Sequence, residues 1–108
     1  MSLTGAGGAS SAAQVSGLSF TFDAAKPAGE RVVEVTVGGQ PLDPAASYRV
    51  ATNDYMLGGG DGYASLGKGV VIIDAAAATL MANTVINYIT AIGGGVELEP
   101  EGRITRLD

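Results

Sequence analysis

The chain contains neither cysteine nor histidine among its 108 residues. Without cysteine it has no disulfide framework, no thiolate metal site and no thiol nucleophile. Without histidine it lacks the commonest general base, the commonest metal ligand and every triad that depends on one. We therefore expect no cofactor and no catalytic metal centre in this chain.

Basic residues are also scarce, with 6 Lys and Arg against 11 Asp and Glu and a net charge of -5. No cluster of Lys or Arg occurs, so binding to nucleic acid or to an anionic membrane surface is not expected. No run reaches the roughly 18 apolar residues of a membrane helix, so none is predicted. The composition indicates one globular domain.

The first 13 residues are mostly Gly, Ala and Ser and lack the basic and apolar regions of a signal peptide. We predict a flexible leader over residues 1–13, either natural or introduced during cloning. The domain itself is predicted over residues 14–108.

Three early segments, 15–23, 31–37 and 48–53, have the composition of strands, and the first two alternate with a period of two. Gly38-Gly39 predicts a tight turn after the second. An antiparallel meander follows from this order. The expected apolar faces are Leu18, Phe20 and Phe22 on the first strand and Val33, Val35 and Val37 on the second.

The second half of the chain predicts a short apolar strand at 70–73, then one helix over 74–92 with Asp74 as its N-cap. A closing strand or pair is expected through 96–98 and 103–107. The fold class is therefore α+β, with a largely antiparallel sheet and one principal helix. A stripe at helical spacing is interpreted as core; it comprises Leu80, Met81, Val85, Tyr88, Ile89 and Ile92.

The segment 52–63 places two tyrosines and two carboxylates around a run of glycines. A Tyr ring can stack on a nucleobase, and a carboxylate can accept two hydrogen bonds from ribose hydroxyls. The plainer interpretation is a Gly-Asp-Gly turn with Tyr55 and Tyr63 in the core. A calcium loop and a phosphate cradle are weaker alternatives, because the spacing of the acids and the missing GK[ST] do not match.

Residues 53–63 closely resemble the signature loop of the 5'-nucleotidase C-terminal domain, which begins Asn-Asp-aromatic and ends Gly-Gly-Asp-Gly-aromatic. The similarity extends in order over about residues 14–104. The other matching segments are 14–18, 37–44, 48–53 and 101–104.

The resemblance implies a role for individual residues. Tyr55 takes the position of the aromatic that stacks on the base, and Asp61 that of the acid that contacts the ribose hydroxyls. Gly59, Gly60 and Gly62 would let the backbone approach the nucleoside closely. A nucleoside or nucleotide is therefore the expected ligand.

Two departures from the family pattern stand out. Ala12 occupies the position of a second stacking aromatic, and no segment matches the family's upstream phosphate-binding Arg and Asn residues. The chain thus resembles the later part of the domain. The resemblance implies that divalent metals on a separate metallophosphoesterase domain of a parent protein hydrolyse nucleoside 5'-monophosphates. The parent would be periplasmic, secreted or on the cell surface, and this chain alone inactive.

Several alternatives remain open at this point. The parent could instead be a UDP-sugar hydrolase, a cyclic-nucleotide phosphodiesterase or a thiosulfate-releasing sulfur-oxidation protein. A different class is an interaction module that kept the fold and lost its ligand. We also predict a homodimer, formed through the sheet face of Leu18, Phe20 and Phe22 left uncovered by the missing upstream part.

Overall fold

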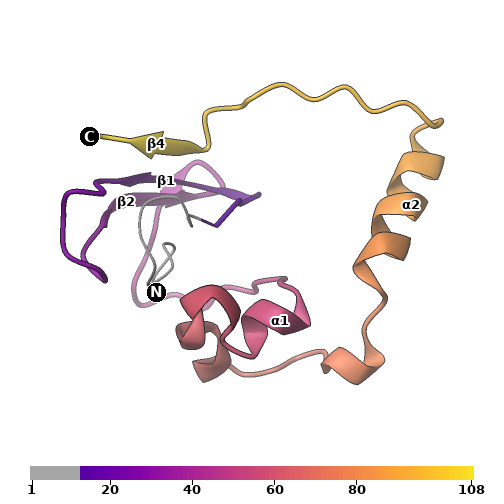
Figure 1. The fold of residues 1–108 in the computed structure, drawn as a ribbon, viewed down its shortest axis with the longest axis horizontal. Coiled ribbons are helices and arrows are strands. Elements are labelled where there is room, and N and C mark those ends of the chain that lie inside the picture. Colours follow the sequence, from indigo (N-terminus) through magenta and orange to yellow (C-terminus); the bar gives the residue numbers. More distant parts are fainter. Residues whose placement is uncertain (1–12) are drawn as a thin grey trace. The chain divides into compact units, whose positions relative to one another are not determined.

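A computed structural model describes residues 13–108, apart from the side chains of Asp61 and Ala64. The predicted leader, except its last residue, and the Ala12 substitution lie outside the described residues. The chain divides into two compact units, Met1–Gly69 with Glu101–Asp108, and Val70–Pro100 (Figure 1).

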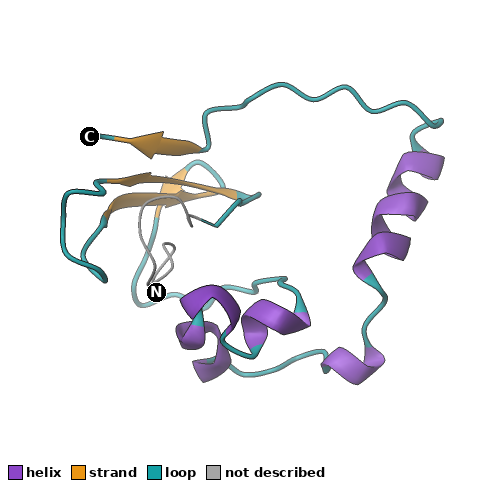
Figure 2. Ribbon diagram, in the orientation of Figure 1, coloured by secondary structure: helices purple, strands orange, loops and turns teal. Residues whose placement is uncertain are grey.

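The first unit contains a four-stranded sheet with the order β3-β2-β1-β4 (Figure 2). Its strands are β1 Leu18–Phe22, β2 Val32–Val37, β3 Gln40–Pro41 and β4 Ile104–Arg106. The β1/β2 and β2/β3 pairs are antiparallel, whereas β4 pairs parallel to β1. The predicted α+β class with a largely antiparallel sheet is confirmed.

One face of this sheet forms a small apolar core around Phe20 and Phe22, which are 3% and 4% exposed. Their ring centroids lie 6.1 Å apart. The predicted face of the first strand is therefore correct, but the expectation that it stays bare is wrong. Apolar side chains of the same unit pack against the two rings; they are Val15, Leu18, Ala24, Val32, Val35 and Ile104.

The face of β2 differs from the prediction at its start. A register shift between Thr21 and Phe22 places Val32 opposite Phe22, while Phe20 still faces Val35. Val33 is consequently 50% exposed and does not join the core. A bulge inserts an extra residue into one strand and so moves the side chains beyond it to the other face.

The turn between β2 and β3 forms as predicted, with Gly38 and Gly39 at φ 58° and 81°. Two consecutive residues with positive φ make the hairpin turn whose twist matches that of its strands. The third strand of the sheet is then β3, and the prediction of a strand over 48–53 is wrong. In that segment Tyr48 turns back locally, and its hydroxyl accepts a hydrogen bond from the Asp43 N–H at 2.9 Å.

The segments 48–53, 70–73 and 96–98 share one reason for not forming strands. None of them pairs with another segment among residues 13–108. A strand exists through the cross-strand hydrogen bonds of its backbone, which an apolar sequence alone does not supply. The predictions of strands at 70–73 and 96–98 are therefore also wrong.

The second unit contains one α-helix, α2, over Met81–Ala91. Asp74 does act as an N-cap, its carboxylate accepting from the Ala76 N–H at 2.9 Å, but only for the single 3-10 turn Ala75–Ala77. The predicted start at residue 74 is thus wrong. Residues 75–78 are all exposed, so the helix propensity of alanine is not reinforced by burial there, and short helices need that reinforcement.

The apolar stripe of α2 is not core in this structure. Among the described residues of the helix none is buried, and Val85 and Tyr88 are more than half exposed. The interpretation of the stripe as core is therefore wrong for the chain as described. No helix within residues 13–108 is long and apolar enough to cross a membrane.

Candidate functional site

The glycine-rich segment folds into consecutive short turns. The helix α1 covers Asp54–Leu57, and two 3-10 helices follow, η2 over Gly60–Gly62 and η3 over Ala64–Lys68. The Tyr63 N–H donates to the Gly60 carbonyl at 3.2 Å, which closes η2. α1 contacts both 3-10 helices. The segment that resembles the signature loop therefore has a defined backbone.

Two side chains at the start of the signature segment organise its first turn. The Asn53 Oδ1 accepts a hydrogen bond from the Met56 N–H at 2.8 Å, and the Asp54 Oδ1 accepts one from the Tyr55 N–H at 2.9 Å. Capping by Asn or Asp satisfies backbone donors that the helix itself leaves without acceptors. These two residues thus hold Tyr55 on α1.

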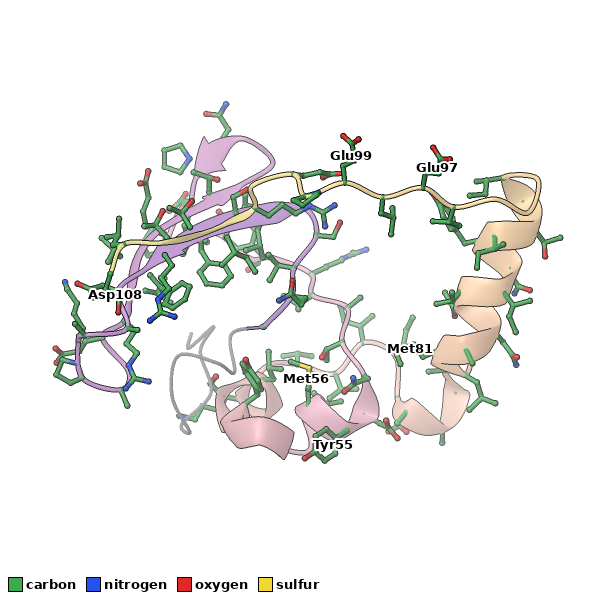
Figure 3. All side chains as sticks on the ribbon, turned by 45° about the horizontal axis from the view of Figure 1, so that its top comes forward. Tyr55, Met56, Met81, Glu97, Glu99 and Asp108 are labelled. Carbon is green, nitrogen blue, oxygen red and sulfur yellow. The ribbon has the colours of Figure 1, made fainter. Side chains whose placement is uncertain are left out.

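The two tyrosines of the segment have different environments. Tyr63 is 4% exposed and forms part of the buried interior of its unit. Tyr55 is 61% exposed, and Figure 3 shows its side chain projecting from α1. The interpretation of both rings as core therefore holds for Tyr63 alone. An exposed aromatic on a structured loop is available to a planar ligand.

The three glycines implicated by the resemblance have distinct local roles. Gly59 and Gly62 have φ of 95° and 81°, a region that side-chain-bearing residues rarely adopt. Gly60 lies against the Tyr55 ring, where an added Cβ would come within 2.5 Å of a ring carbon. The backbone of Asp61 belongs to η2, and its side chain lies outside the described atoms. The structure thus brings Tyr55 and Gly60 together.

Sequence reasoning missed the residues that attach β4 to β1. The Arg103 guanidinium donates to the Val15 carbonyl at 2.8 Å and to Glu101 Oε2 at 2.9 and 2.7 Å. The Asp108 Oδ1 accepts from the Ala24 N–H at 3.1 Å. The Arg103–Val15 and Asp108–Ala24 partners are 88 and 84 residues apart in the chain, so no local pattern could have indicated them.

One carboxylate has a perturbed acidity. The hydrogen bonds from the Arg106 guanidinium and from the Ala24 N–H lower the pKa of Asp108, which is exposed. This group belongs to the edge of the sheet. Among the described side chains, which do not include that of Asp61, no three His, Cys, Asp or Glu gather so as to hold a metal ion.

Two shallow hollows lie on the sheet, with volumes of about 150 and 320 Å³. Ser19, Thr36 and Arg103 line both, and no residue of segment 53–63 lines either. The chemistry of the glycine-rich segment, rather than these hollows, therefore marks the candidate site.

Comparison with known families agrees with the motif. The family model described as "5'-nucleotidase, C-terminal domain" matches residues 1–68, more than half of the chain. The chain belongs to the 5'-nucleotidase C-terminal domain family. The family resemblance drawn from residues 53–63 is thereby confirmed.

Relatives of this family member come from several organisms. A trifunctional nucleotide phosphoesterase protein of Bacillus subtilis is 33% identical over 104 residues, which cover 87% of this chain and 7% of that protein. A cell wall protein of Listeria monocytogenes is 34% identical over 96 residues, 83% of this chain and 12% of that protein. An apyrase of Tabanus yao is 38% identical over 58 residues, 46% of this chain and 10% of the apyrase.

A solved structure has the same fold. The 5'-nucleotidase precursor from Thermus thermophilus is 39% identical and superposes with a TM-score of 0.76 over 88% of this chain. The match covers 19% of the Thermus chain. This family member therefore spans a small part of the length of each of these four proteins.

Proposed function

We propose that this domain binds the base and ribose of a nucleoside or nucleotide, with Tyr55 stacking on the base. The observation that carries the proposal is the contrast between the two tyrosines. Tyr63 is buried, whereas Tyr55 keeps 61% of its surface exposed on a capped, hydrogen-bonded turn. Packing in the core accounts for Tyr63. It does not account for Tyr55, to which we assign recognition of the base. Stacking on an aromatic side chain is worth about 1–3 kcal/mol per base.

Asp61 is the second recognition residue in this proposal. Its backbone lies in η2, between Gly60 and Gly62 and six residues after Tyr55. A carboxylate at this point of the turn would accept hydrogen bonds from the two ribose hydroxyls. Gly59 and Gly62 would allow the ligand to approach the turn without meeting a Cβ, whereas Gly60 lies against the Tyr55 ring.

Hydrolysis is proposed to occur elsewhere, on a metallophosphoesterase domain of a longer parent protein. Two observations support this. The chain has no histidine or cysteine, and its described residues hold no cluster that could bind a metal ion. A chain without histidine or cysteine lacks the side chains that commonly complete a two-metal site. The relatives are longer, and two of them are named as a nucleotidase and a nucleotide phosphoesterase. The parent would convert nucleoside 5'-monophosphates to nucleosides and phosphate.

Titration of the full chain with adenosine and AMP, followed by amide and tyrosine-ring chemical shifts, tests the recognition role. We expect shifts in segment 53–63, and Tyr55→Ala should weaken adenosine binding by about five- to 150-fold. Tyr88→Ala is the matched control, because Tyr88 is 60% exposed but lies on α2. Equal effects of the two substitutions, or no shifts near Tyr55, would contradict the proposal.

Asp61→Asn tests the ribose contact separately. It should weaken adenosine more than free adenine, because only adenosine carries the hydroxyls. Glu97→Gln, another acid-to-amide change in the second unit, should alter neither. Catalysis is tested by incubating the purified chain with AMP and Mn²⁺, Co²⁺ or Zn²⁺. We expect no phosphate release above a blank; metal-dependent turnover would place the hydrolytic centre within this chain.

A second candidate function is that of an interaction module, which is favoured by the apolar side chains that the second unit exposes. Val70 is 93% exposed and Ile72 and Ile73 are each 69% exposed. Self-association through the buried Phe20 and Phe22 is no longer supported, so a homodimer is proposed through 70–73 and α2 instead. Light scattering should show a dimer that Ile72→Asp dissociates and Leu98→Asp, a control in the same unit, does not. A monomeric wild type would exclude this candidate.

A further inference from the structure

Gly60 has an unusual relation to the aromatic ring that precedes it on α1. A Cβ added at Gly60 would lie 2.5, 2.6 and 2.6 Å from the Cε1, Cδ1 and Cζ atoms of Tyr55. Distances below 3.0 Å are not tolerated between such atoms, so the ring and a side chain at residue 60 cannot occupy this space together. The ring thus contacts residue 60 because that residue is glycine.

The three distances also show which part of the ring Gly60 covers. They are nearly equal for three consecutive ring atoms. A point in the ring plane beyond its edge would be clearly farther from the two outer atoms than from the middle one. Near-equal distances instead require a point above the ring. Gly60 therefore lies against one face of Tyr55.

We infer that Gly60 is a positioning residue: it seats one face of Tyr55, so that the ring offers only its opposite face to a planar ligand. This inference rests on the proposed function and deepens it. Tyr55 remains 61% exposed with one face covered, so much of its accessible surface belongs to the other sides of the ring. A nucleobase would stack from one direction only.

The backbone at Gly60 does not itself require glycine. Unlike Gly59 and Gly62, Gly60 is outside the positive-φ region. The atoms that an alanine would meet belong to the outer part of an exposed, rotatable side chain. Gly60→Ala should therefore displace the Tyr55 ring and leave the fold intact. Gly60→Ala therefore tests the position of the ring without changing the stability of the fold. Substitutions at Gly59 and Gly62 would change the stability as well, because both residues have positive φ.

Gly58 provides a matched control in the same turn. A Cβ there would lie 3.4 Å from the Asp54 carbonyl oxygen and 3.7 Å from that of Tyr55, which are ordinary contacts. Its φ of -76° suits alanine. Gly58→Ala adds the same methyl group two residues away without touching the ring.

The experiment compares the full chain with Gly60→Ala, Gly58→Ala, Tyr55→Ala and the double variant Tyr55→Ala/Gly60→Ala. We expect Gly60→Ala alone to shift the assigned Tyr55 ring resonances without ligand, and to weaken adenosine binding about tenfold. The melting temperature should stay near that of Gly58→Ala. In the Tyr55→Ala background, Gly60→Ala should have no further effect on adenosine binding.

Unchanged Tyr55 ring resonances in Gly60→Ala would contradict the inference that Gly60 lies against one face of the ring. Displaced resonances with unchanged adenosine affinity would overturn its role in positioning, as would an additive loss in the double variant. If the wild type binds no nucleoside, the proposed function fails, while the ligand-free ring resonances still decide whether Gly60 seats Tyr55.

Discussion

Truncating the two tyrosines of the glycine-rich segment should separate stability from recognition. Tyr63→Ala removes a ring that is 4% exposed, whereas Tyr55→Ala removes one that is 61% exposed. The first change should destabilise the unit with little direct role in binding. The second should weaken nucleoside binding at a smaller cost in stability.

The magnitudes follow from the buried area. A buried aromatic removes about 150–250 Å² from water at about 25 cal/mol per Å², and its truncation costs about 3–5 kcal/mol. We expect about 4 kcal/mol for Tyr63→Ala. Tyr55 buries about two-fifths as much, so about 1–2 kcal/mol is expected for Tyr55→Ala, as an upper estimate.

Urea denaturation monitored through the amide signals of residues 54–68 measures both free energies of unfolding. These signals report the unit that contains the two rings, which matters because the chain divides into two compact units. Adenosine titration of each folded variant then measures recognition. An equal or larger stability loss for Tyr55→Ala, or full loss of binding for a folded Tyr63→Ala, would refute the assignment of the two rings.

Three further predictions concern the sheet. Arg103→Ala should lower the free energy of unfolding by about 1 kcal/mol through its lost hydrogen bonds, and speed amide exchange in β4, whereas Arg49→Ala, an exposed control, should do neither. Folding lowers the pKa of the Asp108 carboxyl. Its ionised form therefore stabilises the folded chain at pH values above the unfolded-state pKa, and this stabilisation is lost as the pH falls through the folded-state pKa. The urea midpoints of wild type and Asp108→Asn should therefore differ at neutral pH and converge as the pH falls below the folded-state pKa of Asp108; a constant difference would contradict this. Gly39→Ala should lower the free energy of unfolding by about 1–2 kcal/mol, because the φ of Gly39 is 81°. Gly95→Ala is the control, because a Cβ at Gly95 would meet open space, and it should leave the melting temperature unchanged.

Local pattern was enough to locate the elements whose partners are close in the chain. Period-two alternation identified β1 and β2 and the face of Phe20 and Phe22, and Gly38-Gly39 identified the turn to β3. Helical spacing identified α2, although not its first residue. The motif at 53–63 identified the family. All of these depend on interactions within a few residues or on a contiguous string of side chains.

Other features were decided by contacts between distant residues. The parallel pairing of β4 with β1 joins Phe20 to Ile104, and an alternating pattern says which face is apolar without saying which strand lies beside it. The bulge that exposes Val33 arises from the same cross-strand register. Segments such as 70–73 have the composition of strands but no partner among residues 13–108, and composition alone cannot provide one.

The candidate site divides in the same way. The residue types of the site and their spacing could be identified from the sequence, because recognition of a base and a ribose requires an aromatic, a carboxylate and glycines. Which tyrosine is buried, and that Gly60 lies against the face of the other, was decided only by the folded turns. Tyr55 and Tyr63 are chemically identical, and the difference between them is the amount of protein that the three-dimensional path of the backbone places around each ring.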